Sequence, residues 1–195
     1  MSQVKISGNA SGTGVLTIAA PNTNTDRSIT IPDKAGAIAV GAGTIVQVVH
    51  QKSTTTTTIS TTTLTDTGVT ADITPTSTSN KILIQASIPV NGFRSSSEAG
   101  GGFVCLRDST TIYEEIGATG NVRFSQYFGS IGTTTINWYF TIPFTILDSP
   151  ASTSTLTYKF QASAHNTANG GILKINPSSS ATGGESHLIL MEVVA

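Results

Sequence analysis

Residues 136–146 alternate strictly between apolar and mostly polar side chains. The apolar positions are Ile136, Trp138, Phe140, Ile142, Phe144 and Ile146, and those between them are Asn137, Tyr139, Thr141, Pro143 and Thr145. A period of two residues places each set on one face of an extended strand. The segment therefore predicts a strand with one face in a core. Because Pro143 has no N–H, we expect this strand at a sheet edge or at a bulge.

Similar strand patterns recur along most of the chain after residue 43. The alternation is repeated by Leu156, Tyr158, Phe160, Ala162 and Ala164. The segments TIVQVVH (44–50) and HLILMEVVA (187–195) are apolar at both parities, which predicts neighbouring strands that are buried on both faces. A long strand is expected over 81–90, and a hairpin is expected to turn at Asp108-Ser109-Thr110.

A threonine-rich stretch, STTTTTISTTTLTDTG, follows Lys52. It could be a linker, but Ile59, Leu64 and Val69 interrupt it as core candidates, so extended edge strands are favoured over disorder. VRFSQYFGS (122–130) is a further candidate strand, and no helical periodicity exceeds one turn. The fold class predicted for residues 43–195 is all-β, a β-sandwich or jelly-roll head of about eight to ten strands.

Residues 1–42 have a different character from this head. Short β-prone pieces of four to six residues alternate there with glycine, asparagine and proline. The segment has too little apolar surface to fold alone, but three copies wound together could share a narrow core. Its members would be Val15, Leu16, Ile18, Ile29, Ile31 and Ile38. We interpret 1–42 as an intertwined stem or docking arm, and Gly41 and Gly43 would let the chain leave it for the head; a flexible tail is the alternative.

The composition excludes several classes of protein. Charged residues make up 11% of the chain and the net charge is -1, so a nucleic-acid partner is not expected. The 33 threonines and 23 serines indicate a solvated β surface. A single cysteine, Cys105, allows no internal disulfide and is expected to be a small buried side chain. No signal peptide or apolar run of membrane-spanning length is seen, so we expect synthesis in the cytoplasm and no membrane insertion.

No motif in the chain names a reaction. Glu114 and Glu115 are the only adjacent acids, and neighbours on a strand point to opposite faces. His50, His165 and His187 lie in separate strands or turns; a sheet could bring them together, but they have no spacing typical of metal ligands. Nucleophile-elbow and phosphate-loop motifs are missing from the sequence. We expect no enzyme, no catalytic or metal-binding residues and no cofactor.

A binding role is harder to exclude. Aromatic and hydrogen-bonding side chains of the kind that bind sugars are spread along the predicted loops. They are Arg94, Glu98, Tyr113, Arg123 and Tyr127. An ordinary surface role is the better explanation for each of them, so none is assigned to a site.

Two sets of segments carry a resemblance to a known family. GTGVLTIAAPNTNTDRSITIPDKAGAIAV (12–40) resembles a short module of bacteriophage tail-fibre and fibre-like proteins, notably from phages of marine bacteria and cyanobacteria. Its pattern is a T-I-x-A-P strand, an Asn/Thr turn and R-x-I-T-I-P-D-x-x-G. Further segments look like the C-terminal head of the same proteins: GTIVQVVHQ, ITPTSTSNKILIQASI, LRDSTTIYEE, LDSPASTSTLTYKFQA and LILMEV.

The resemblance implies a homotrimeric virion protein with a stem and a β head. Residues 1–42 would dock to other virion proteins of the capsid or tail, and the head would decorate the capsid or attach to a host glycan or protein. A soluble carbohydrate-binding module is the alternative. A polysaccharide-cleaving spike would be a third possibility, and it would depend on Asp108, Glu114 or Glu115.

Overall fold

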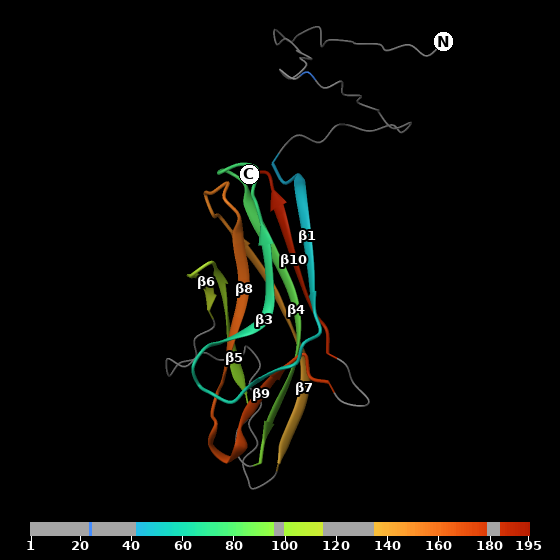
Figure 1. Ribbon diagram of the computed structural model, residues 1–195, viewed down its shortest axis with the longest axis vertical. Coiled ribbons are helices and arrows are strands. Elements are labelled where there is room, and N and C mark those ends of the chain that lie inside the picture. Colours follow the sequence, from blue (N-terminus) through green and yellow to red (C-terminus); the bar gives the residue numbers. More distant parts are fainter. Residues whose placement is uncertain (1–23, 25–41, 96–99, 115–134, 179–183) are drawn as a thin grey trace, which may run out of the picture. The chain divides into compact units, whose positions relative to one another are not determined.

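The chain is described from a computed structural model, which covers residue 24 and residues 42–95, 100–114, 135–178 and 184–195 (Figure 1). Two units divide the chain, Met1–Ile38 and Ala39–Ala195. Apart from residue 24, every described residue belongs to the second unit, which is called the head below. The predicted stem and the strand predicted over 122–130 lie outside the described residues.

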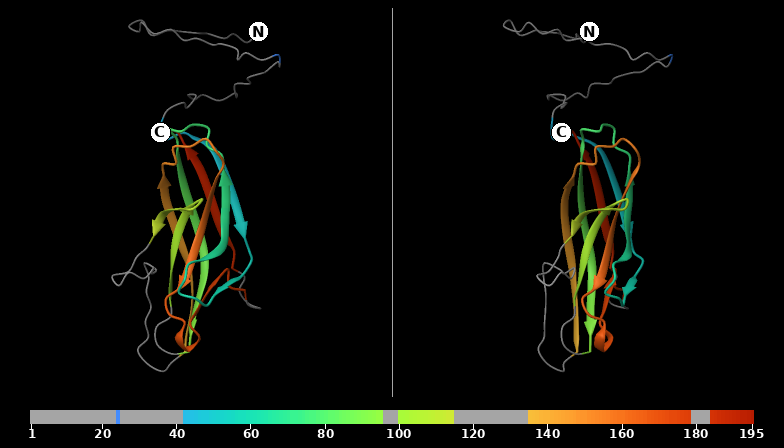
Figure 2. Two further views of the ribbon diagram at one scale, coloured as in Figure 1. Left: turned by 60° about the vertical axis from the view of Figure 1, so that its left-hand side comes forward. Right: turned by 90° about the vertical axis from the view of Figure 1, so that its left-hand side faces the viewer.

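The described part of the head is all-β, with ten strands in two antiparallel sheets and one 3-10 turn at Ala168–Gly170. The first sheet contains β1 (Ile45–Ser53), β2 (Thr57–Ile59), β4 (Lys81–Arg94), β7 (Ile136–Asp148), β9 (Ile172–Ile175) and β10 (Ser186–Val193). The second contains β3 (Thr65–Ile73), β5 (Gly101–Arg107), β6 (Thr110–Glu114) and β8 (Leu156–Ala164). In Figures 1 and 2 the strands of both sheets run lengthwise through the head.

β4 is the strand around which the first sheet forms. One of its edges pairs with β7 along almost its whole length, from Ile82 to Arg94. The other edge pairs first with β10 and then, from Val90 to Phe93, with β9. β10 also pairs with β1, and β9 pairs with β2. The order across the sheet is therefore β1, β10, β4 and β7. Further along β4, β9 takes the place of β10 and β2 takes the place of β1.

The inner faces of the two sheets enclose the core. Alternate residues of β4, such as Ile82, Ile84 and Ile88, are fully buried. Aromatic rings join the sheets, since the ring of Phe144 in β7 lies 4.8 Å from that of Phe160 in β8, between ring centroids. Burial of such large apolar side chains supplies most of the favourable free energy of folding.

Polar groups tie the two sheets together at the margin of this core. Arg107 at the end of β5 contacts Asp148 at the end of β7 at 2.6 Å, and the buried Tyr158 hydroxyl donates to the same carboxylate at 2.7 Å. Burial, followed by this hydrogen bond, raises the pKa of Tyr158. The tyrosine therefore stays neutral, and its hydroxyl remains a hydrogen-bond donor to Asp148.

Most of the strand predictions are confirmed. β7 buries Ile142 and Phe144, leaves Tyr139, Thr141, Pro143 and Thr145 exposed, and is an edge strand among the described strands. All five predicted core positions of β8 are buried, and so is Cys105. The hairpin turns at Asp108, whose φ is 54°, and Ser109, with Thr110 beginning β6. The long strand continues past Val90 to Arg94.

Two predictions near the start of the head need correction. The threonine-rich stretch does form edge strands, β2 and β3, with Ile59 and Val69 buried, but Leu64 is exposed. β1 and β10 pair as expected. However, β1 is not buried on both faces within one chain, because Val46 and Val48 are exposed. The reason is that β1 is an edge strand whose outer side chains have no layer above them.

Candidate functional site

The two sheets differ in the side chains that they turn away from the core. On the outer face of the second sheet, Gln161 donates to Asp66 at 2.7 Å and Lys159 lies 3.1 Å from the same carboxylate. The hydrogen bond from Gln161 is the main reason that the pKa of Asp66 lies below its ordinary value. Thr157 similarly donates to Asp72 at 2.7 Å. Such paired polar side chains are typical of a face that meets water.

The corresponding face of the first sheet carries a row of apolar side chains. Pairing aligns Val48 of β1 with Met191 of β10, Met191 with Leu83 of β4, and Leu83 with Leu147 of β7. Because residues paired across a sheet share a face, these four side chains cross all four strands on one side. We call them the apolar row.

The apolar row faces outward rather than into the core. Its neighbours along the strands, Ile82, Ile84 and Leu190, are completely buried, so Leu83 and Met191 point the opposite way. At the two ends of the row, Val48 is 59% exposed and Leu147 is 57% exposed. Ile45 and Val46 at the start of β1 are also exposed, and Ile189 occupies the outer face two residues before Met191. On this side of the head a row of apolar side chains is thus open to solvent at its two ends.

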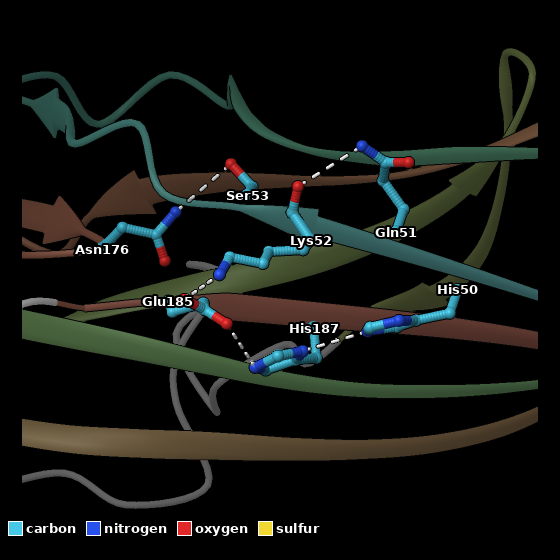
Figure 3. A network of polar contacts seen from close by, with 7 residues as sticks. All are labelled: His50, Gln51, Lys52, Ser53, Asn176, Glu185 and His187. Atoms are coloured by element: carbon cyan, nitrogen blue, oxygen red, sulfur yellow. Dashed lines mark hydrogen bonds and ion pairs between the residues drawn. The ribbon is translucent and has the colours of Figure 1, made fainter.

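Beside the apolar row lies a network of polar side chains from β1 and the start of β10 (Figure 3). The imidazole Nε2 of His50 is 3.0 Å from Nδ1 of His187. The rings are 9° from parallel with centroids 5.3 Å apart. That separation fits an in-plane N–H···N hydrogen bond between ring edges better than face-to-face stacking. The pairing of Lys52 with His187 across the two strands brings the rings into contact.

Glu185 links this histidine pair to a cation. Its carboxylate lies 3.1 Å from Nε2 of His187 and 2.5 Å from the ammonium group of Lys52. The hydrogen bond from Lys52 is the main reason that the pKa of Glu185 lies below its ordinary value. If Nε2 of His187 donates to Glu185, its Nδ1 is the acceptor for Nε2–H of His50. The network then pairs the Lys52 ammonium group, the Glu185 carboxylate and both ring nitrogens of His187.

The histidine pair falls short of a metal centre as it stands. Zinc sites in proteins use three or four nitrogen, sulfur or oxygen ligands. Within the described parts of the chain, no group of three or more His, Cys, Asp or Glu side chains is arranged to hold a metal ion. The arrangement is best described as a self-contained polar patch beside the apolar row.

Further along the same face, an open hollow of about 400 Å³ lies over β4 and β7. Its lining residues are Pro89, Val90, Tyr139, Phe140, Thr141, Pro177 and Gly184. Tyr139 is 52% exposed and sits opposite Asn91 in the pairing of the two strands. The hollow can accept an apolar side chain of another chain or the flat face of a sugar ring.

The structure brings together two of the three histidines considered from the sequence. His50 and His187 form the pair, whereas His165 follows β8 and its amide donates to the carbonyl of Gly100. Glu114 is exposed at the end of β6, and Glu115 lies outside the described residues. Asp108 turns the β5–β6 hairpin and accepts a hydrogen bond from the amide of Thr157 at 2.9 Å, so its role is structural.

Of the residues considered for sugar binding, the structure describes two, Arg94 and Tyr113, which lie in different sheets. Arg94 is buried at the end of β4, where its Nε donates to the carbonyl of Ala168 at 2.9 Å. Tyr113 is half-buried and packs edge-on against Phe144. Glu98, Arg123 and Tyr127 lie outside the described residues. Arg94 is therefore not the surface group expected from the sequence, whereas Tyr113 is partly exposed.

Sequence reasoning did not single out the apolar row, although the signal was present. Both end strands are apolar at both parities, and KILIQASIP (81–89) carries apolar residues at both parities in its first half. On its own the pattern predicts burial within one chain. The alternative interpretation, an apolar face covered by something outside the chain, gives the same pattern.

No helix in the described residues is long and apolar enough to cross a membrane. Compared with known proteins, the chain matches no family model and no curated protein.

Proposed function

We propose that this chain is a non-enzymatic surface protein of a bacteriophage virion. It would form a short trimeric fibre or spike, anchored to the capsid or tail by residues 1–42 and displaying residues 43–195 as a jelly-roll-like head. The head would decorate the capsid or attach the particle to a glycan or protein of the host surface. The chain would be made in the host cytoplasm.

The observation that carries this proposal is the difference between the two outer faces of the head. One face pairs its charged and polar side chains with one another, and the other presents exposed valine, isoleucine and leucine side chains. Large exposed apolar patches on soluble proteins mark sites of association. A head with one face for water and one face for association suits a display protein built from several copies.

The N-terminal segment supports the same proposal from the sequence side. Residues 1–42 are too poor in apolar surface to fold alone, and residues 12–40 resemble a fibre module of marine phages. Closed rotational symmetry is the usual outcome when identical chains associate. A homotrimer joins both features in one assembly.

Two measurements test the proposal. The mass of the full chain in solution, from sedimentation or light scattering, is expected to be that of three chains; a monomer would contradict it. Antibody-labelled electron microscopy of phage particles is expected to place the protein on the virion. Density on the shell would indicate capsid decoration, density on the tail would indicate attachment, and a particle without label would remove the virion role.

The hollow beside Tyr139 favours a second candidate, a soluble carbohydrate-binding module. An exposed tyrosine beside two prolines offers the apolar, hydrogen-bonding surface on which sugar rings stack. This candidate predicts a monomer that binds glycans without residues 1–42 and loses binding in Tyr139→Ala. Glycan-array binding by the full chain and by this variant distinguishes the two candidates when it is combined with the mass.

A further inference from the structure

We propose that copies of this chain contact one another through the outer face of the first sheet, with the apolar row at the centre of the contact. The inference rests on the proposed homotrimer and specifies where its heads meet. The surface consists of Val48, Met191, Leu83 and Leu147, together with Ile45 and Ile189. The partner is a second copy of the same head.

The exposure of these side chains is the first step. Three large apolar residues of β1 and one of β7 are about half exposed or more, namely Ile45, Val46, Val48 and Leu147. They come from both edge strands, and Leu83 and Met191 fill the space between them. A continuous apolar band across the full width of a sheet differs from the scattered single apolar residues that are normal on protein surfaces. Covering it would remove this apolar area from water.

The area of the face is the second step. Four strands spaced about 4.8 Å apart give a width of about 19 Å, and the 14 residues of β4 span about 46 Å. The rectangle, which includes the polar patch and the hollow as well as the apolar row, has an area of about 900 Å² before side-chain relief is counted. A stable protein interface buries about 800 Å² on each partner. The outer face of this sheet is large enough for a stable contact with other copies.

The polar groups beside the row give the third step, which favours a copy over a partner of different chemistry. Lys52, Glu185 and His187 satisfy one another, and His50 bonds to His187. This patch therefore offers little unpaired charge to an acidic or basic partner. An apolar row is complementary to itself, and in a closed ring every copy supplies the same surfaces. Three such faces turned toward a common axis would each be covered.

Cross-linking of the full-length chain tests the contact. In Met191→Cys the only other thiol is Cys105, which is buried. With a short bismaleimide, Met191→Cys is expected to give a covalent two-chain product. The matched control is Thr70→Cys, an exposed position on β3 in the polar outer face of the second sheet, and it is expected to stay single. Equal cross-linking of the two variants, or none in a chain that is trimeric, would overturn the inference.

A charge placed in the apolar row provides a second, independent readout. Leu83→Lys in the full chain is expected to raise the concentration at which half of the assembly dissociates by at least about tenfold. Thr70→Lys should leave this concentration unchanged. If circular dichroism shows that Leu83→Lys does not fold, Val48→Lys replaces it, because Val48 lies at a more exposed position on an edge strand.

The outcomes separate this inference from the proposed function. A monomeric wild-type chain contradicts the homotrimer itself. A trimeric wild type whose Leu83→Lys and Val48→Lys variants dissociate no more readily leaves the trimer standing and overturns the contact surface. Assembly would then depend on residues 1–42. Leu83→Lys could instead block the binding of a glycan or of another virion protein without any effect on the trimer. That result would assign the apolar row to this partner and would also overturn the inference.

Discussion

At the scale of single residues, Glu192 is a fully buried acid among the described residues. It lies in β10 with no exposed surface, and its Oε1 accepts hydrogen bonds of 2.7 Å from the Thr76 amide, the Thr76 hydroxyl and the Asn80 side chain. Burial by itself would raise the pKa of Glu192, but these hydrogen bonds outweigh it and hold the pKa below the ordinary value. The carboxylate fastens the turn between β3 and β4 to β10.

This environment predicts a pH-dependent contribution to stability. An acid whose pKa is lowered by folding stabilises the native state above its unfolded pKa, and the contribution is lost as the pH falls through the folded pKa. Glu192→Gln should therefore lower the free energy of unfolding by about 1–3 kcal/mol at neutral pH. The difference from wild type should shrink on acidification below about pH 4. Denaturant unfolding of both proteins at neutral pH and below about pH 4 measures this difference. A difference that does not depend on pH would contradict a lowered pKa for Glu192.

Cys105 gives a second prediction at this scale. Burial, with a smaller contribution from the charge of Asp148, raises the pKa of the thiol to about 12. At pH 8 only about one thiol in ten thousand would be ionised, and the thiolate is the reactive form. A colorimetric thiol reagent should leave the native chain unmodified and react with one thiol per chain in denaturant. Rapid labelling of the native chain would show that β5 opens readily.

At the scale of elements, the break between β9 and β10 depends on one side chain. Asn176 is fully buried with φ at 49°, a left-handed conformation that asparagine tolerates better than most residues. Its side-chain oxygen accepts a hydrogen bond from the Ser186 hydroxyl at 2.6 Å. Its side-chain nitrogen donates to the carbonyl of Thr55 at 3.2 Å. The residue thus joins the end of β9, the start of β10 and the segment between β1 and β2.

Two substitutions separate the conformational role of Asn176 from its hydrogen bonds. Asn176→Gly keeps the left-handed backbone and loses the side-chain bonds, so it should lower the free energy of unfolding by about 2 kcal/mol. Asn176→Ala loses the same bonds and adds the strain of a positive φ, and should cost about 1 kcal/mol more. Thermal or denaturant unfolding measures both. Equal losses would mean that the backbone relaxes at this position.

Element by element, the sequence predicted what depends on local periodicity. The alternation at 136–146 correctly located a strand, its buried side and, through Pro143, its edge position. Register was not predictable, because it depends on which strands pair; the contact of His50 with His187 follows from the β1–β10 pairing alone. For the same reason the alignment of the apolar row was not predictable, since its four members come from four strands that are distant in sequence; the sequence shows only that these strands carry apolar residues at both parities.

At the scale of the whole molecule, the proposed contact predicts how assembly responds to salt. Contacts between apolar faces are not screened by ions, whereas contacts between exposed charges are strongly weakened above about 0.1 M salt. The dissociation constant of the assembly should therefore change by less than about threefold between 0.05 M and 1 M sodium chloride. Sedimentation of the full chain at both concentrations measures it. Marked weakening in high salt would point to ion pairs between copies.

The line formed by β9 and β10 has a consequence for how proteins of this kind can vary. Both strands lie along one edge of β4, and between them the Gly184 amide donates to the Pro177 carbonyl at 2.9 Å. Residues inserted between Ser178 and Gly184 would leave the pairing of β9 and of β10 with β4 in register. We therefore expect natural diversification, or a grafted peptide epitope, to be accepted there at little thermodynamic cost.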